Sequence, residues 1–231
     1  MPIIKLLCTF IILALSGQVI AQDNIVLSKD SDTIFTARFI LEKRKLFSIP
    51  EINNDTTEFV FRSWKPNSML EIKKKDSLVS GSVTYFVLDA WEGSKEVFAK
   101  QYVLDLKEAV NTYKFITNSA AVNLPSDKYI SGWQLGFDGI TYTFEKKDGN
   151  AYSFKKYWTP SSQHGLSEAI AIEKFHEDLY TIIGDKYYKD FDSVNPFLNY
   201  KYPGEAYTIM KVVTAKEYRK YKKKHKKLYG N

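Results

Sequence analysis

The chain has 231 residues, of which 44% are hydrophobic, 15% aromatic and 26% charged. These proportions are typical of a globular protein and exclude a disordered or fibrous one. One cysteine excludes a disulfide scaffold and a zinc site built on cysteines, and three histidines leave little room for a histidine-rich metal centre.

The first 21 residues have the layout of a secretory signal peptide. Lys5 precedes a nearly uninterrupted apolar run from 6 to 15, which a polar stretch ends. The run is shorter than the roughly 20 apolar residues that span a bilayer, so we expect cleavage after Ala21 rather than an uncleaved anchor. Because cleavage removes Cys8, we expect a secreted or periplasmic protein whose mature chain is cysteine-free.

In the body of the chain, aromatic and β-branched residues gather in short runs that are separated by Gly, Pro, Asn or Ser. This pattern predicts the strands of an antiparallel meander. The expected strand regions are 33–47, 57–64, 70–72, 83–91 and 96–104.

Two segments have helical periodicity. From Leu106 to Ile116, apolar residues recur at spacings of three and four, and Asp105 is a suitable N-cap. A second helix is predicted from Leu166 to Ile182, and the following glycine suits its C-terminal end.

A hairpin is predicted between these helices, with strands at 139–145 and 151–158 and a turn at Asp148-Gly149. After the second helix, 187–203 carries six aromatic residues without a period, and we expect it to wrap across the core in an ordered way. Strands that surround two helices without βαβ alternation predict an α+β fold: an antiparallel sheet with two principal helices on one face, plus a C-terminal basic helix.

Residues 22–204 are expected to form a single α+β domain, and 205–231 the last strand and the basic C-terminal helix. Thr214 is a suitable N-cap for a helix from Ala215 to about Leu228. The last sixteen residues hold eight basic side chains and one acidic one, a net charge of +7, whereas residues 22–215 carry −2.

This basic segment has two open interpretations. It is either a solvated helix or a contact for an anionic partner: lipid headgroups, a cell-wall polymer or an acidic protein. Export disfavours nucleic acid. The residues expected to make an anionic-surface contact are Arg219, Lys220, Lys222, Lys223, Lys224, Lys226 and Lys227.

The chain has no Walker loop, dinucleotide-binding glycine pattern, HExxH, GxSxG or EF-hand spacing. We therefore expect no cofactor and no metal. His176 is expected at the surface or boundary of the second helix, because no partner spacing supports a ligand role.

The loops that flank the predicted hairpin hold the candidate ligand-binding residues, since functional side chains concentrate on loops. Rings and polar groups there could line one end of the sheet and bind a sugar or peptide by stacking and hydrogen bonding. Core packing explains the rings equally well, and a tight turn between two glycines explains the aspartate. The candidates are Trp133, Asp138, Tyr157, Trp158 and His164.

Several short motifs resemble those of an uncharacterised group of exported bacterial α+β proteins of unknown function. The motifs are Arg62-Ser63-Trp64 near Pro66, Asn123-Leu124-Pro125 after a helix, Gly136-Phe137-Asp138-Gly139 before a hairpin, and a closing helix. The resemblance covers about 58–184 and implies export and one α+β domain. It implies no activity. The Ser63-Trp64 pair departs from the Thr-Phe of that group.

Taken together, these features predict an exported, non-enzymatic binding or envelope-associated domain with an unknown envelope or extracellular partner. Two alternatives remain open. One is a hydrolase that acts on cell-surface polymer through carboxylates. The other is a structural envelope protein.

Overall fold

The computed structural model describes residues 26–33, 38–52, 55–136 and 139–230, so the predicted leader lies outside the described residues. The strands are β1 (Val26–Leu27), β2 (Phe59–Lys65), β3 (Ser68–Lys75), β4 (Leu78–Asp89), β5 (Val97–Val103), β6 (Thr141–Asp148), β7 (Ala151–Trp158), β8 (Asn199–Lys201) and β9 (Ile209–Met210). The helices are α2 (Arg38–Phe47), α3 (Leu106–Asn118), α4 (Ser167–Ile183), α5 (Lys186–Val194) and α6 (Ala215–Tyr229), with short 3-10 turns η3 (Ala120–Asn123), η4 (Asp127–Tyr129) and η5 (Pro160–Ser162).

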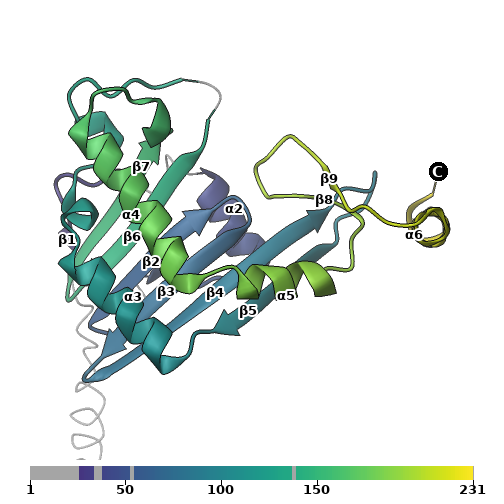
Figure 1. Ribbon diagram of the computed structural model, residues 1–231, viewed down its shortest axis with the longest axis horizontal. Helices are drawn as coiled ribbons and strands as arrows, with labels where there is room; N and C mark the ends of the chain where they lie inside the picture. Colours follow the sequence, from purple (N-terminus) through teal and green to yellow (C-terminus); the bar gives the residue numbers. More distant parts are fainter. Residues whose placement is uncertain (1–25, 34–37, 53–54, 137–138, 231) are drawn as a thin grey trace, which may run out of the picture.

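The described strands form one mostly antiparallel sheet, which confirms the predicted α+β class (Figure 1). The order begins β1-β7-β6-β2-β3-β4, and β5 pairs with the far side of β4. Beyond the end of β3, the same side of β4 pairs with β8, which in turn pairs with β9. Among the pairs of described strands, only β1 and β7 are parallel.

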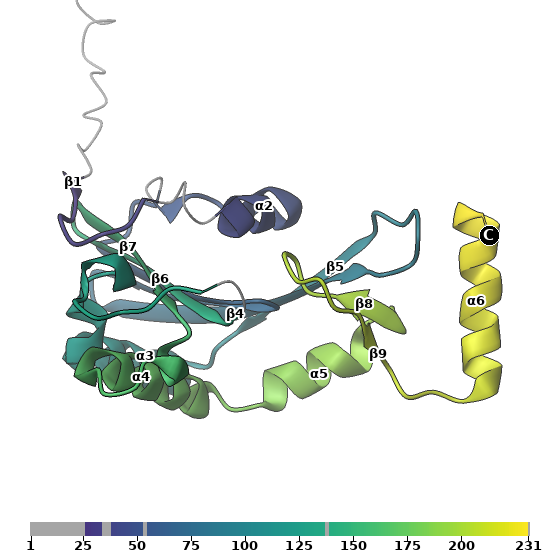
Figure 2. The same ribbon diagram turned by 90° about the horizontal axis from the view of Figure 1, so that it is seen from above.

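The helices lie on both faces of the sheet. Figure 2 shows α3, α4 and α5 on one face and α2 on the other. On the first face, Phe61, Leu70 and Val83 of the strands pack with Ile116 of α3 and Phe175 of α4. Alternation along each strand separates this core from a smaller one under α2.

The helix that begins after Asp105 is confirmed as α3. The Asp105 side chain accepts a hydrogen bond from the backbone N–H of Glu108, and the Glu108 side chain accepts one from the backbone N–H of Asp105. This capping box satisfies N–H groups that would otherwise lack a partner. The second predicted helix is confirmed as α4, and Gly184 ends it with a φ of 71°.

The prediction of a strand at 33–47 is wrong for residues 38–47, which form the helix α2. The inward face of this helix carries Ile40 and Phe47 but also Lys43 and Arg44, which are 1% and 8% exposed. Two charged residues on the buried face hide the helical pattern of apolar residues.

One smaller prediction needs correction, and another gains detail. The hairpin strands extend through Asp148, so the connection is Gly149-Asn150 rather than a turn centred on Asp148-Gly149. The region 187–203 is ordered, as predicted, and it contains most of α5 and all of β8, which the sequence analysis did not identify. Three aromatic residues on one short helix are too few to reveal its period.

Candidate functional site

The predicted ligand residues at the end of the hairpin pack largely against one another. The rings of Trp133 and Tyr157 lie 5.9 Å apart, and Trp133 Nε1 donates a hydrogen bond of 3.0 Å to the carbonyl oxygen of Trp158. Tyr157 is fully buried, and its hydroxyl donates to the carbonyl oxygen of Leu124. These contacts give the rings a packing role.

Two further candidates, Asp138 and His164, complete the predicted set. Asp138 lies outside the described residues. His164 is exposed in the turn between η5 and α4. The ligand-binding role of the five residues therefore stays a prediction.

Gln163 stabilises this end of the sheet, and the sequence analysis did not single it out. Its side-chain oxygen accepts from the N–H of Gln134 at 2.8 Å, and its amide nitrogen donates to the carbonyl oxygens of Gln134 and Trp158. Gln163 is 5% exposed, so it acts as an internal cross-link between two loops rather than as a ligand group.

A buried carboxylate, Glu145, organises the face that α2 covers. Its Oε1 pairs with Arg44 and accepts from the Tyr152 hydroxyl, while its Oε2 accepts from Trp64 Nε1 at 2.7 Å. Glu145 is fully buried. Burial and the neighbouring carboxylate raise the pKa of Tyr152, so its hydroxyl remains a donor.

The neighbouring pair on the same face is Arg62 and Glu71, which are opposite each other on β2 and β3. Arg62 is fully buried, and its guanidinium donates to Glu71 at 2.7 Å and to the carbonyl oxygen of Pro50. Arg62 of the Arg-Ser-Trp motif thus holds the half-buried carboxylate of Glu71, and Trp64 holds the buried one of Glu145. The structure gives this motif a structural role.

Asp127 is a further buried carboxyl, in the 3-10 turn η4. It is 1% exposed, and burial raises its pKa. Its Oδ2 accepts from the N–H of Trp158, which fixes the start of η4 against β7. Nearby Asp32 pairs with Lys128 at 2.9 Å and has a lowered pKa; burial opposes this shift and the lysine contacts produce it.

At the opposite end of the sheet, α6 is bound to the body through a buried polar cluster. Asp89, the last residue of β4, accepts from the Tyr221 hydroxyl through Oδ1 and contacts His225 Nε2 through Oδ2, both at 3.0 Å. The ring of Trp91 lies 5.1 Å from that of His225. Tyr221 and His225 are 7% and 3% exposed, so this contact fixes the orientation of α6.

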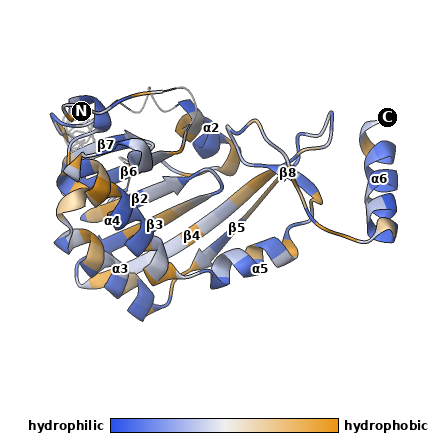
Figure 3. Cartoon of the chain, turned by 45° about the horizontal axis from the view of Figure 1, so that its top comes forward, coloured by the Kyte–Doolittle hydropathy of each residue, from blue (hydrophilic) through white to orange (hydrophobic). Residues whose placement is uncertain are grey.

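The predicted basic helix is confirmed in α6, with Thr214 and Glu217 forming a capping box at its start. Figure 3 shows α6 as hydrophilic over most of its length. Its eight basic side chains are exposed, and none forms an ion pair within the described part of the chain. They are Lys216, Arg219, Lys220, Lys222, Lys223, Lys224, Lys226 and Lys227.

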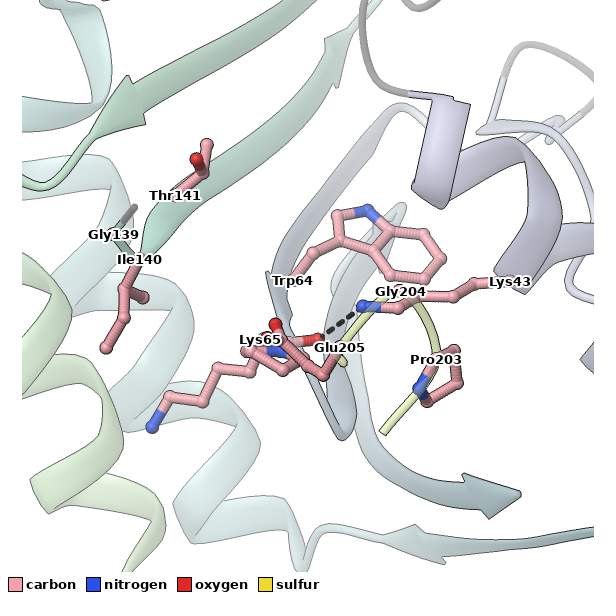
Figure 4. A pocket seen from close by; sticks show the side chains of 10 residues that line it. Lys43, Trp64, Lys65, Gly139, Ile140, Thr141, Pro203, Gly204 and Glu205 are labelled. Carbon is pink, nitrogen blue, oxygen red and sulfur yellow. Dashed lines mark hydrogen bonds between the residues drawn. The ribbon is translucent and has the colours of Figure 1, made fainter. Parts of the chain in front are cut away.

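Two pockets meet at Lys65, where β2 ends. The smaller has a volume of about 120 Å³ and lies between α2, the start of β6 and the Pro203-Gly204 turn (Figure 4). The larger is open, with a volume of about 690 Å³, and lies beside α4 and the start of α5. Lys65 was not a sequence candidate, since no spacing connects it to the helices that complete the larger pocket.

His176 is buried beside Lys65, which corrects the expectation of a surface or boundary position. It is 7% exposed, and its ring stacks on Tyr142 with a centroid distance of 3.8 Å. Burial and, to a smaller extent, the ammonium of Lys65 lower its pKa to about 3. The imidazole is therefore neutral at physiological pH.

Within the described residues, no group of three or more His, Cys, Asp or Glu side chains could hold a metal ion. The described helices include none with the length and hydropathy needed to cross a bilayer. Comparison with protein-family models, curated proteins and solved structures found no match. The resemblance to exported bacterial proteins thus remains a prediction.

Proposed function

We propose that the protein is an exported, non-enzymatic binding domain that attaches to an anionic component of the cell envelope through α6. The observation that carries the proposal is a row of basic side chains on the side of α6 opposite its buried contacts. Export rests on the leader in the sequence.

The geometry of an α-helix separates the two sides of α6. Successive residues are about 100° apart, so Tyr221 and His225 share one side. Arg219, Lys223 and Lys227 lie on the other side, together with Lys216. A helix of 15 residues is roughly 22 Å long, so these side chains form an extended basic row that suits a flat anionic surface such as a layer of lipid headgroups.

The buried contact distinguishes α6 from a frayed basic tail. Because Asp89 fixes Tyr221 and His225, the basic row has a defined direction relative to the sheet. Both ribbon views place α6 at the end of the molecule farthest from β1 (Figures 1 and 2). A surface can therefore contact α6 without displacing the body.

Vesicle co-sedimentation tests this proposal. We expect the full chain to bind phosphatidylcholine vesicles that contain phosphatidylglycerol more strongly than phosphatidylcholine alone, and to lose binding as salt increases. A variant with glutamine at positions 216, 219, 223 and 227 should bind at least tenfold more weakly, since each basic residue near such a surface contributes about 1 kcal/mol.

The matched control removes the same number of charges from the body. Lys45, Lys75, Lys95 and Lys114 are exposed, and replacing them with glutamine leaves α6 intact. If the two variants lose binding equally, net charge alone accounts for vesicle binding, which would contradict the proposal. Binding to a soluble polyanion without binding to the vesicles would also contradict the lipid surface as the target.

A further inference from the structure

Lys65 has a half-buried ammonium group without a counterion. Its Nζ lies 3.2 Å from the centroid of the Tyr180 ring, and it forms no ion pair or hydrogen bond with any side chain or carbonyl of the described chain. Burial lowers its pKa to about 8, so the Lys65 side chain is protonated in most molecules at neutral pH. The face of the tyrosine ring favours the charged form but leaves the N–H donors of the ammonium available.

Lys43, the other buried lysine nearby, has a different environment. Its Nζ donates a 3.0 Å hydrogen bond to the carbonyl oxygen of Lys65, and Glu205 favours its charged form. Figure 4 shows the amine of Lys43 directed at this carbonyl, while the Lys65 side chain extends away from it toward α4. Lys43 therefore has a structural role, whereas the contacts of Lys65 leave a donor group facing a pocket.

The larger pocket beside Lys65 has groups that suit a hydroxylated ligand. Its volume of about 690 Å³ lies in the range of small-molecule sites, roughly 300–1,000 Å³. Asn67 comes from the turn between β2 and β3, Ser68 is the buried first residue of β3, and Tyr180 comes from α4, where its hydroxyl contacts Ser63 at 3.4 Å. The side-chain amide of Asn67 makes no hydrogen bond within the described residues, so it is available to a ligand hydroxyl.

The charges around this pocket limit the charge of the ligand. Glu177 and Asp185 also line it, and Asp185 pairs with Lys189 at 2.6 Å. Among the described residues that line the pocket, Lys65 is thus the one cation without a carboxylate partner, and Glu177 adds a negative charge to the same wall. Such a wall suits one negative charge better than the two of a phosphate monoester.

Asp185 is poorly suited to act as the general acid of a hydrolase. The contact with Lys189 keeps the pKa of Asp185 below its usual value. A general acid needs a raised carboxyl pKa, because it must carry a proton at the working pH.

We propose that this pocket binds a small hydroxylated monocarboxylic acid, such as a sugar acid, with the carboxylate on Lys65 Nζ and a hydroxyl group on the side-chain amide of Asn67. The proposal is independent of α6, which lies elsewhere on the molecule. It stands or fails separately from attachment to an anionic surface.

Isothermal titration calorimetry on the full chain tests the class of ligand. The probes are glucuronate, galacturonate and gluconate, with glucose as the neutral analogue and glucose 6-phosphate as the dianion. We expect at least one of the acids to bind, and to bind at least tenfold more tightly than either comparison sugar. Failure of all three acids, equal binding of glucose or tighter binding of the phosphate would each overturn the proposal.

Substitutions test the position. Lys65→Gln should weaken binding of the acid at least tenfold, and Asn67→Ala, which removes the side-chain amide, should weaken it by a smaller factor. Lys174→Gln is the control, since Lys174 is an exposed lysine of α4 that pairs with Asp178. Unchanged affinity in Lys65→Gln with an unchanged melting temperature, or an equal loss in Lys174→Gln, would place the ligand elsewhere and refute the assignment.

Discussion

At the scale of single residues, Glu145 shows how a buried charge can determine the position of several elements. It connects β6 to α2 through Arg44, to β2 through Trp64 and to β7 through Tyr152. A buried ion is costly unless its partners compensate for the lost water. The arrangement therefore favours one placement of α2 over others that would leave the carboxylate unpaired.

Replacement of Glu145 by alanine should lower the free energy of unfolding by about 3–5 kcal/mol, because Arg44 would remain buried without its partner. Urea unfolding followed by circular dichroism measures this difference. Glu92→Ala, at an exposed glutamate, is the control and should change stability by less than about 0.5 kcal/mol. Similar values for the two variants would refute the role assigned to the buried carboxylate.

At the scale of elements, segments with one apolar face were predictable and those with a charged buried face were not. The spacing of apolar residues predicted α3 and α4, and runs of aromatic and β-branched residues predicted β2 and most of β4. In α2, Lys43 and Arg44 face inward because Lys65 and Glu145 supply their partners. Those partners are distant in the sequence, so no local pattern reveals them.

The candidate sites follow the same rule. The charge of α6 is contiguous in the sequence and was predictable, whereas its buried contact depends on Asp89, which lies 136 residues from His225. The pocket beside Lys65 combines a turn with residues of β4, α4 and α5. No spacing links these segments, so only the folded chain brings them together.

Docking of α6 should depend on Asp89. Asp89→Ala removes the acceptor of both Tyr221 and His225, and each buried donor left without a partner costs about 1–3 kcal/mol. We expect amide hydrogens at 215–229 to exchange faster, measured by mass spectrometry, while those of β2–β4 stay protected. Unchanged exchange at 215–229 would show that other contacts hold the helix.

At the scale of the whole molecule, acid stability depends on groups whose protonation differs between the folded and unfolded states. His176 binds a proton near pH 6.5 when unfolded but only near pH 3 when folded. Asp55 has its folded pKa lowered to about 2; burial opposes this shift, and contacts with Lys73 and Thr57 produce it. The stability that Asp55 contributes is lost only as the pH falls below about 4, whereas protonation of His176 in the unfolded state begins at higher pH.

Between about pH 6.5 and pH 3 the unfolded state binds more protons at His176, so stability should decrease as pH falls, by up to about 1.4 kcal/mol per pH unit. His176→Phe retains a ring against Tyr142 and removes the titrating group. Urea unfolding at pH 7, 6 and 5 should therefore show a steeper loss for the natural chain than for this variant, with a difference of roughly 2 kcal/mol at pH 5 relative to pH 7. Contributions from the other titrating groups cancel in the comparison. If the two proteins lose stability in parallel, His176 accepts a proton in the folded state near its ordinary pKa. That result would refute the assignment of a neutral, buried imidazole beside Lys65.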